Sequence, residues 1–417
     1  MLVCVGCLAG YGALIRGRRA PSTPSTPSEA KAPEQFVRAA APTEAAAAPS
    51  AAADLKSRAD DAGKIEVDFC GLGKVAFHAD DAAGPGRYLD GLTKPTARRW
   101  LSALLNSDDN RARAAGLFLQ NKIAGAGIMP MQEQARDALI QLAVGSGDPA
   151  VYATAVGACD TDGDSAKGAC EQISLKGWTQ VDPDNAVPWL LLAGKAHARK
   201  DAAGEANAFN HASKASKVDS YNFSLLAYAE PELPKDATPL ERWWLAVETI
   251  GIEAAFGMRQ YGIASKHCSA AAVQDSDVQQ QCSELAEVFV TKGTNLLDLG
   301  VGTSMGARAG WTKERVAGLK QEGDALTQAL VQATPAGVEN QWTCGAVERG
   351  NAYVREAIQL GELRATREAL ERSGETVAEL AGKWRDYLAR IRREAQQREQ
   401  EEARQNPEQL PQPEQRQ

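Results

Sequence analysis

The sequence contains little of what nucleic-acid-binding and metal-dependent proteins need. Among its 417 residues, 46 lysines and arginines are outnumbered by 54 aspartates and glutamates, which gives a net charge of −8. A phosphate-binding surface needs an excess of basic side chains, so we expect no nucleic-acid partner. The only histidines are His78, His197, His211 and His267, and only His267 has another potential ligand, Cys268, beside it. We therefore expect no transition-metal site and no cofactor.

Catalytic motifs are also scarce. We find no P-loop, no zincin helix and no cysteine–histidine nucleophile pair. Residues 302–306 match G-x-S-x-G, but that motif needs a strand before the serine and a histidine after it. The residues before Gly302 have a helical pattern, and the last histidine is His267. We expect a Gly-rich helix connection here and a protein that is not an enzyme; a carboxylate pair among the many acidic residues is the alternative.

No apolar run reaches the ~20 residues that span a bilayer. Residues 2–15 (LVCVGCLAGYGALI) are apolar and uncharged but shorter than this, and arginines follow at positions 16, 18 and 19. We interpret residues 1–19 as an anchor or truncated signal whose start lies upstream, because a tether follows; a short buried segment is the alternative. Cys4 and Cys7 are best explained as small residues of an apolar helix rather than as lipidated or redox-active thiols.

Residues 20–60 are rich in Pro, Ala, Ser and Thr (PSTPSTPS, then APTEAAAAPSAAA). Such a segment cannot bury apolar surface, so we expect a disordered linker. An apolar stub, a tether and a folded body are typical of a membrane-anchored extracytoplasmic protein, and we expect a bacterial inner-membrane protein with its body in the periplasm. The arginines after the stub argue against this topology, because positive charge tends to stay on the cytoplasmic side.

Six of the eight cysteines lie in the body of the chain. Two local couples flank predicted helix connections, and the remaining two cysteines are far apart in sequence. An even number with local couples predicts disulfides and an oxidising compartment; unrelated buried thiols in a cytosolic protein are the alternative. The expected pairs are Cys159 with Cys170, Cys268 with Cys282, and Cys70 with Cys344.

One acidic loop resembles a calcium-binding loop in its spacing. Asp160, Asp162, Asp164 and Glu171 hold positions 1, 3, 5 and 12 of such a loop between two helices. Position 6 is Ser165 instead of the glycine that the sharp turn needs, and a disulfide across the loop would draw its ends together. This Ca²⁺ site is a weak candidate, and a polar, disulfide-closed turn is the preferred interpretation.

The secondary structure is predicted to be almost entirely helical. The exception is a β-hairpin, where Ile65, Val67 and Phe69 alternate with polar residues before a Gly-Leu-Gly turn. A lone hairpin is marginal in water, so it should pack on the helices and be held there through Cys70. Alternate helix starts are separated by about 36 residues, the scale of helical-hairpin repeats. The starts are expected near residues 97, 111, 132, 149, 168, 186 and 203.

Residues 182–216 have the clearest pattern. An opening Asp-Pro-Asp-Asn precedes an apolar helix face, and after a break at residues 201–204 small residues recur at helical spacing. The first set is Trp189, Leu192, Ala193 and Ala196, and the second is Ala208, Ala212 and Ala215. This hairpin resembles a tetratricopeptide repeat (TPR). The resemblance implies a mainly α fold, a TPR-like array of antiparallel helical hairpins whose neighbours stack.

The C-terminal half continues with longer helices. We expect one helix near residues 240–254, with Trp243 and Trp244 in the core rather than in a ligand groove, and another spanning residues 278–299. Residues 338–403 should form one or two charged helices, with a short seam at residues 377–391. Docking of this seam on the body is favoured over dimerisation, because it covers only about two heptads.

The predicted segments are an anchor (1–19), a linker (20–60), a β-hairpin segment (61–91), a TPR-like array (92–230), a helical region ending in a long helix (238–391) and a disordered polar tail (392–417). We expect a scaffold or adaptor whose concave surface binds a protein or peptide partner. An envelope-associated enzyme and a purely structural subunit are the alternatives.

Overall fold

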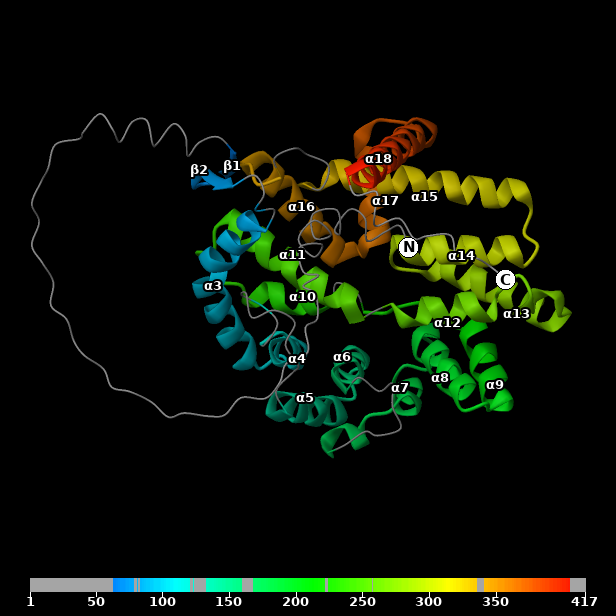
Figure 1. The fold of residues 1–417 in the computed structure, drawn as a ribbon. Helices are drawn as coiled ribbons and strands as arrows, with labels where there is room; N and C mark the ends of the chain where they lie inside the picture. Colours follow the sequence, from blue (N-terminus) through cyan, green and yellow to red (C-terminus); the bar gives the residue numbers. More distant parts are fainter. Residues whose placement is uncertain are drawn as a thin grey trace, which may run out of the picture.

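Helices form nearly all of the described chain, as expected, and one β-hairpin precedes them (Figure 1). The computed structural model describes residues 63–78, 81, 83–120, 123, 133–159, 168–221, 224–256, 258–335 and 341–405. The predicted anchor (residues 1–19), the whole predicted linker (residues 20–60) and the first two residues of the predicted hairpin segment lie outside these residues. None of the helices described combines the length and the hydropathy needed to cross a bilayer.

The predicted β-hairpin is confirmed. Strands β1 (Lys64–Phe69) and β2 (Gly73–His78) pair antiparallel, with Val67 opposite Val75. Phe69 is fully buried and its ring contacts those of Tyr88 and Trp342, so the hairpin packs on the helical body. The backbone N–H of Cys70 also donates to the carbonyl oxygen of Trp342.

Helix α3 (Gly84–Leu105) corrects two predicted boundaries. The predicted hairpin segment extended to residue 91 and the first helix was expected near residue 97, but α3 begins at Gly84 and contains Pro95. An interior proline costs a helix about 3 kcal/mol. The cost is offset because α3 buries Leu89, Trp100 and Leu104 completely on its inner face.

Helices α3 to α9 form an arc, and α10 to α12 cross its inner side (Figure 1). Most expected starts are confirmed within two residues, but residue 168 begins a short 3₁₀ turn (Gly168–Gln172) rather than an α-helix. The elements of the arc are α4 (Asn110–Leu119), α5 (Glu133–Ser146), α6 (Pro149–Cys159), α7 (Leu175–Val181), α8 (Ala186–Ala198) and α9 (Ala202–Ser213). The returning elements are α10 (Ser224–Ala229), α11 (Pro239–Phe256) and α12 (Arg259–His267). The chain itself therefore covers much of the concave side, since α10 packs on α4 and α12 on α8.

The predicted helical hairpin corresponds to α8 and α9, which pack on each other. Ala193, Ala208 and Ala212 are fully buried between the helices, as small residues at a close helix contact should be. Trp189 lies at the edge instead, where its ring stacks on His211 and its Nε1–H donates to the carbonyl oxygen of Pro183.

The predicted single helix over residues 278–299 is two helices, α13 (Ser276–Lys292) and α14 (Leu296–Arg308). Asn295 and Asp298 form a capping box that starts the second helix. The G-x-S-x-G segment lies inside α14, so the expected helix connection is wrong there. Its glycines allow close packing: a Cβ at Gly302 would lie 2.8 Å from Cβ of Phe289, and one at Gly306 would lie 2.3 Å from the ring of Trp311.

The C-terminal region contains three helices after α15 (Lys313–Ala333), not one or two: α16 (Cys344–Leu360), α17 (Glu362–Ser373) and α18 (Val377–Gln405). The predicted docking of the last helix is confirmed, because α18 packs along α15. The predicted tail boundary at residue 392 is wrong, since α18 continues to Gln405 through residues of high helix propensity. Trp243 and Trp244 are buried in the core as expected.

The six body cysteines lie in the three expected couples. Disulfides join Cys70 to Cys344, Cys159 to Cys170, and Cys268 to Cys282, with Cα–Cα distances of 4.4, 5.7 and 5.6 Å. The first bond joins the β-hairpin to the start of α16, and the other two close local connections within the helical body.

Candidate functional site

A groove of about 680 Å³ lies between α4 and α5, next to the end of α3. We call the apolar part of its lining the floor, and the polar part, which carries amide, guanidinium and hydroxyl groups, the rim. The floor contains Leu105, Leu117, Ala138 and Leu142, and the rim contains Asn110, Arg113, Gln141 and Ser146. An apolar floor with a few polar groups above it is the usual construction of a binding site.

The rim side chains are held in place by one another and by neighbouring helices. Arg113 donates from Nη2 to Oδ1 of Asn110 at 2.9 Å, within the first turn of α4. Gln141 of α5 donates from Nε2 to Oε1 of Gln172 at 3.3 Å. Amide groups offer both donors and acceptors, so this rim can pair with the N–H and C=O groups of an extended chain.

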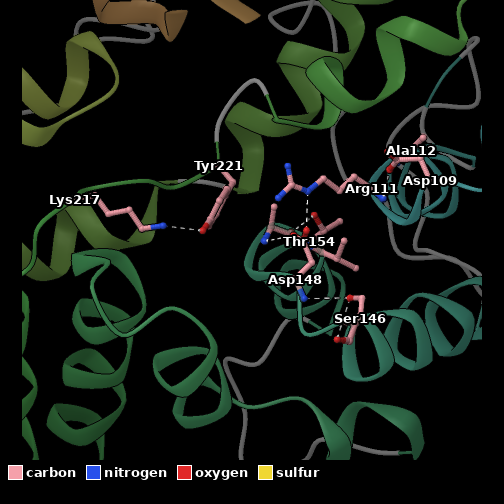
Figure 2. Close-up of polar contacts among 11 residues, drawn as sticks. Asp109, Arg111, Ala112, Ser146, Asp148, Thr154, Lys217 and Tyr221 are labelled. Carbon is pink, nitrogen blue, oxygen red and sulfur yellow. Dashed lines mark hydrogen bonds and ion pairs between the residues drawn. The ribbon is translucent and has the colours of Figure 1, made fainter. Parts of the chain in front are cut away.

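An ion pair fixes one end of the groove (Figure 2). Arg111 of α4 donates from Nε to Oδ2 of Asp148 at 2.7 Å, and its guanidinium lies 5.0 Å from the ring centroid of Tyr228. Asp148 also caps α6 by accepting from the N–H groups of Ala150 and Val151, and its own N–H donates to Ser146. The start of α4 is thereby tied to the α5–α6 turn.

Two opposing effects set the pKa of Asp148. Partial burial raises the pKa. The hydrogen bond from Arg111 and those from the backbone of Val151 and Ala150 together lower it by more than burial raises it, so the carboxyl titrates below its ordinary range. The same hydrogen bond raises the pKa of Arg111. Both groups are therefore charged throughout the physiological pH range.

We expect Arg111→Met to lower the free energy of unfolding by about 1 kcal/mol, because the pair is only partly buried. The variant should also reduce the salt dependence of stability, since partly exposed ion pairs are screened. Urea unfolding at low and at high salt measures both effects. Arg98→Met is the control, because Arg98 forms no ion pair with any described residue. Equal stability losses in the two variants would contradict a stabilising role of the Arg111–Asp148 ion pair.

The Asp-Pro-Asp-Asn motif serves a second polar network, between α7 and α8. Asp182, only 5% exposed, accepts from Lys217 at 2.8 Å, Tyr221 at 2.6 Å and Asn185 at 2.8 Å. Asn185 accepts from the N–H of Asp219, and Lys217 donates to the hydroxyl of Tyr221, as Figure 2 shows for the last pair. Burial, and then the hydrogen bond to Asp182, raise the pKa of Tyr221. Within this network the groups are satisfied by one another, so the motif has a structural role.

A cavity of about 90 Å³ lies beside this network, where α6, α7, α8, α11 and α12 meet. Trp178 Nε1 and Ser220 Oγ are buried in its wall and form no hydrogen bond within the described residues. The cavity has room for only a few molecules of water, and these polar atoms suit such occupants. It is too small for a peptide.

The predicted site residues are only partly described. Asp160, Asp162 and Asp164 of the calcium candidate lie outside the described residues, and Glu171 lies in the 3₁₀ turn beside the Cys159–Cys170 disulfide. The described part of the chain contains no group of three or more His, Cys, Asp or Glu side chains suited to a metal ion. His197 and His211 do not face each other: His197 contacts Glu205, and His211 stacks on Trp189.

Sequence reasoning missed the α4–α5 groove. Ala138, Leu139 and Leu142 recur at helical spacing as one apolar stripe, but the structure buries Leu139 and leaves Ala138 exposed and Leu142 half-buried. The stripe contains more apolar residues than the packing of the helix covers, and this excess was the signal that could have revealed the groove. Comparisons with protein-family models, with curated proteins and with solved structures give no match to this chain.

Proposed function

We propose that this protein is a non-catalytic adaptor, a TPR-like helical array tethered to a membrane outside the cytosol, and that its α4–α5 groove binds an extended peptide segment of a protein partner. The observation that carries the proposal is the groove itself, with leucines in the floor and amides on the rim. Its volume is within the range of ligand-binding clefts.

The concave side of the arc is a weaker candidate than the groove, because α10 and α12 already occupy much of it. A peptide at the groove would place apolar side chains against Leu117 and Leu142 and pair its backbone with Asn110 and Gln141. Burial of apolar area supplies the affinity, and the amides orient the chain. The three disulfides and the Pro/Ala-rich tether support the extracytoplasmic location.

The test is selection of short random peptides displayed on phage against the immobilised full chain, followed by affinity measurement for a selected peptide by fluorescence anisotropy. We expect Leu142→Lys to weaken binding by about tenfold or more, because it places a charge in the apolar floor. A photo-crosslinking residue at Ala138, which is exposed within the groove, should label the same peptide.

The matched control is Val144→Lys. Val144 lies two residues further along α5, is 49% exposed and does not line the groove. Its variant carries the same new charge and should keep wild-type affinity. If both variants bind the selected peptide equally well, the groove is not the binding site.

A further inference from the structure

A second groove, of about 430 Å³, lies between α8, α9 and α12, and it has a different chemistry. The apolar part includes Ala193, Phe209 and Ile263, and charged or ionisable side chains stand at its edge: His197, Glu205, Lys266 and His267.

Glycines shape this groove. A Cβ at Gly194 would lie 2.5 Å from Cδ1 of Ile263, so α8 and α12 approach closely at that point. A Cβ at Gly262 would meet no atom within 4 Å, which places open space directly above this turn of α12. The groove is therefore open at Gly262 and closed below by the Gly194–Ile263 contact.

Lys266 is held over the groove by a chain of polar contacts. Its Nζ lies 3.2 Å from Nε2 of His197, and Nδ1 of His197 lies 3.0 Å from Oε2 of Glu205. An ammonium group only donates, so Nε2 accepts and the proton on Nδ1 points to Glu205. Glu205 is thereby engaged by His197, and within the described residues no carboxylate pairs with Lys266.

His267 adds an aromatic wall without adding charge. Its ring stacks on Phe209 with centroids 3.5 Å apart, and its Nε2 lies 2.9 Å from Oε1 of Gln281. Burial lowers the pKa of His267, which outweighs the hydrogen bond to Gln281, so the ring is neutral near pH 7. Lys266 is then the cation at this edge that remains available to a ligand.

We propose that this groove binds a carboxylate attached to an apolar group, with Lys266 as its ion-pair partner and the Ala193–Phe209–Ile263 surface as the seat of the apolar part. A carboxylate complements the ammonium, and the apolar surface beside it excludes water from one side of the pair. The carboxylate can belong to a free aliphatic acid or to the C-terminus of a peptide. This site is separate from the α4–α5 groove, and the proposal does not depend on the function proposed there.

Isothermal titration of the full chain with matched probes tests the proposal. Hexanoate represents the free acid, and a tripeptide ending in leucine with a free C-terminus represents the peptide. Hexanamide and the C-terminally amidated tripeptide lack the charge, and acetate lacks the apolar group. We expect at least one of the two carboxylates to bind about tenfold more tightly than its amide, and acetate to bind more weakly than hexanoate. Tighter binding of hexanoate identifies the ligand as a free aliphatic acid, and tighter binding of the tripeptide identifies it as a peptide C-terminus.

Three variants locate the site. Lys266→Met should weaken binding of that carboxylate by about tenfold while keeping the aliphatic stem. Lys214→Met, an exposed lysine just after α9, should leave it unchanged. Gly262→Leu should block the groove, and the open space around Gly262 lets the fold accept it. Failure of both carboxylates to bind, or equal binding by the Lys266→Met and Lys214→Met variants, would overturn the proposal. Neither outcome affects the Leu142→Lys test of the α4–α5 groove.

Discussion

Replacing Cys70 and Cys344 together with alanine is expected to lower the free energy of unfolding by about 5 kcal/mol. This bond closes the longest loop of the three, because its cysteines are 274 positions apart in the sequence. In the chain-entropy account, a disulfide stabilises by restricting the unfolded chain, and the effect grows slowly with loop length. The shorter Cys159–Cys170 closure, with a separation of 11, should contribute about 3 kcal/mol.

The loss should be concentrated at the β-hairpin. A two-stranded hairpin is marginal alone, and β1 and β2 form the whole of this sheet. After the bond is removed, the hairpin is still held by noncovalent contacts, among them the packing of Phe69 against Tyr88 and Trp342 and the backbone hydrogen bond from Cys70 to Trp342. We expect amide hydrogens of β1 and β2 to exchange faster in the Cys70→Ala/Cys344→Ala variant.

Urea unfolding of the wild type and of both double variants measures the difference. The Cys159→Ala/Cys170→Ala variant is the control, because its bond closes a local connection far from the hairpin. Equal losses in the two double variants would contradict the dependence on loop length. Mass spectrometry of the native protein without reductant completes the test: six free thiols there would end the extracytoplasmic part of the proposed function.

The elements that sequence could predict are those decided by neighbouring residues. The alternation of Ile65, Val67 and Phe69 determines the hairpin, and helical spacing of apolar residues determines the cores of α4 to α9. Boundaries failed where tertiary packing outweighed a local signal. The first helix was expected near residue 97, just after Pro95, but the buried inner face of α3 carries the helix through this proline. The short connection Gly293–Asn295 between α13 and α14 was not predicted, because apolar residues continue to recur at helical spacing across it.

The path of α10 to α12 across the arc was not predictable, because it depends on contacts between segments far apart in sequence. The α4–α5 groove was missed for a related reason. Leu142 and Leu139 carry the same periodic signal, and only the packing of α4 and α6 decides which of them is covered. Lys266 gave no local signal at all, since its partner His197 lies 69 residues away in the chain.

Raising the pH from about 5 to about 8 is expected to destabilise the fold by roughly 4 kcal/mol through two buried carboxyl groups, Asp298 and Glu362. Burial raises the pKa of Asp298 to about 7. Burial, with the neighbouring charge of Asp298 as a smaller cause, raises the pKa of Glu362 to about 7 as well. Because the two groups interact, they should release their protons as a pair rather than as independent sites.

The two carboxyls belong to the first turns of α14 and α17. Asp298 accepts from the N–H groups of Thr294 at 2.8 Å and Asn295 at 3.2 Å and from the hydroxyl of Tyr261 at 3.0 Å. Glu362 accepts from the backbone N–H of Leu296. These hydrogen bonds offset part of the cost of burial, but not all of it, because both pKa values remain above their ordinary range.

The sign of this change in stability with pH follows from the number of protons bound by the folded and unfolded states. In the unfolded chain these groups titrate near their ordinary values of 3.8 and 4.5, whereas in the fold they hold protons up to about pH 7. Between these values the folded state binds more protons than the unfolded state, so stability falls as the pH rises. The contribution is fully present below about pH 4 and is lost through about pH 7.

Glu362→Gln separates this effect from the other titrating groups. His267 acts in the opposite direction below its ordinary pKa, because the unfolded chain takes up a proton that the buried ring does not. The lowered pKa of Asp148 matters only below about pH 4. The difference between Glu362→Gln and the wild type therefore isolates the titration of Glu362 and its coupling to Asp298: we expect the variant to be more stable than the wild type near pH 8 and close to it near pH 5. Glu348→Gln, at an exposed position of α16, should follow the wild type throughout. Parallel stability curves for Glu362→Gln and the wild type, measured by urea unfolding, would show that Glu362 is already ionised in the fold at pH 5.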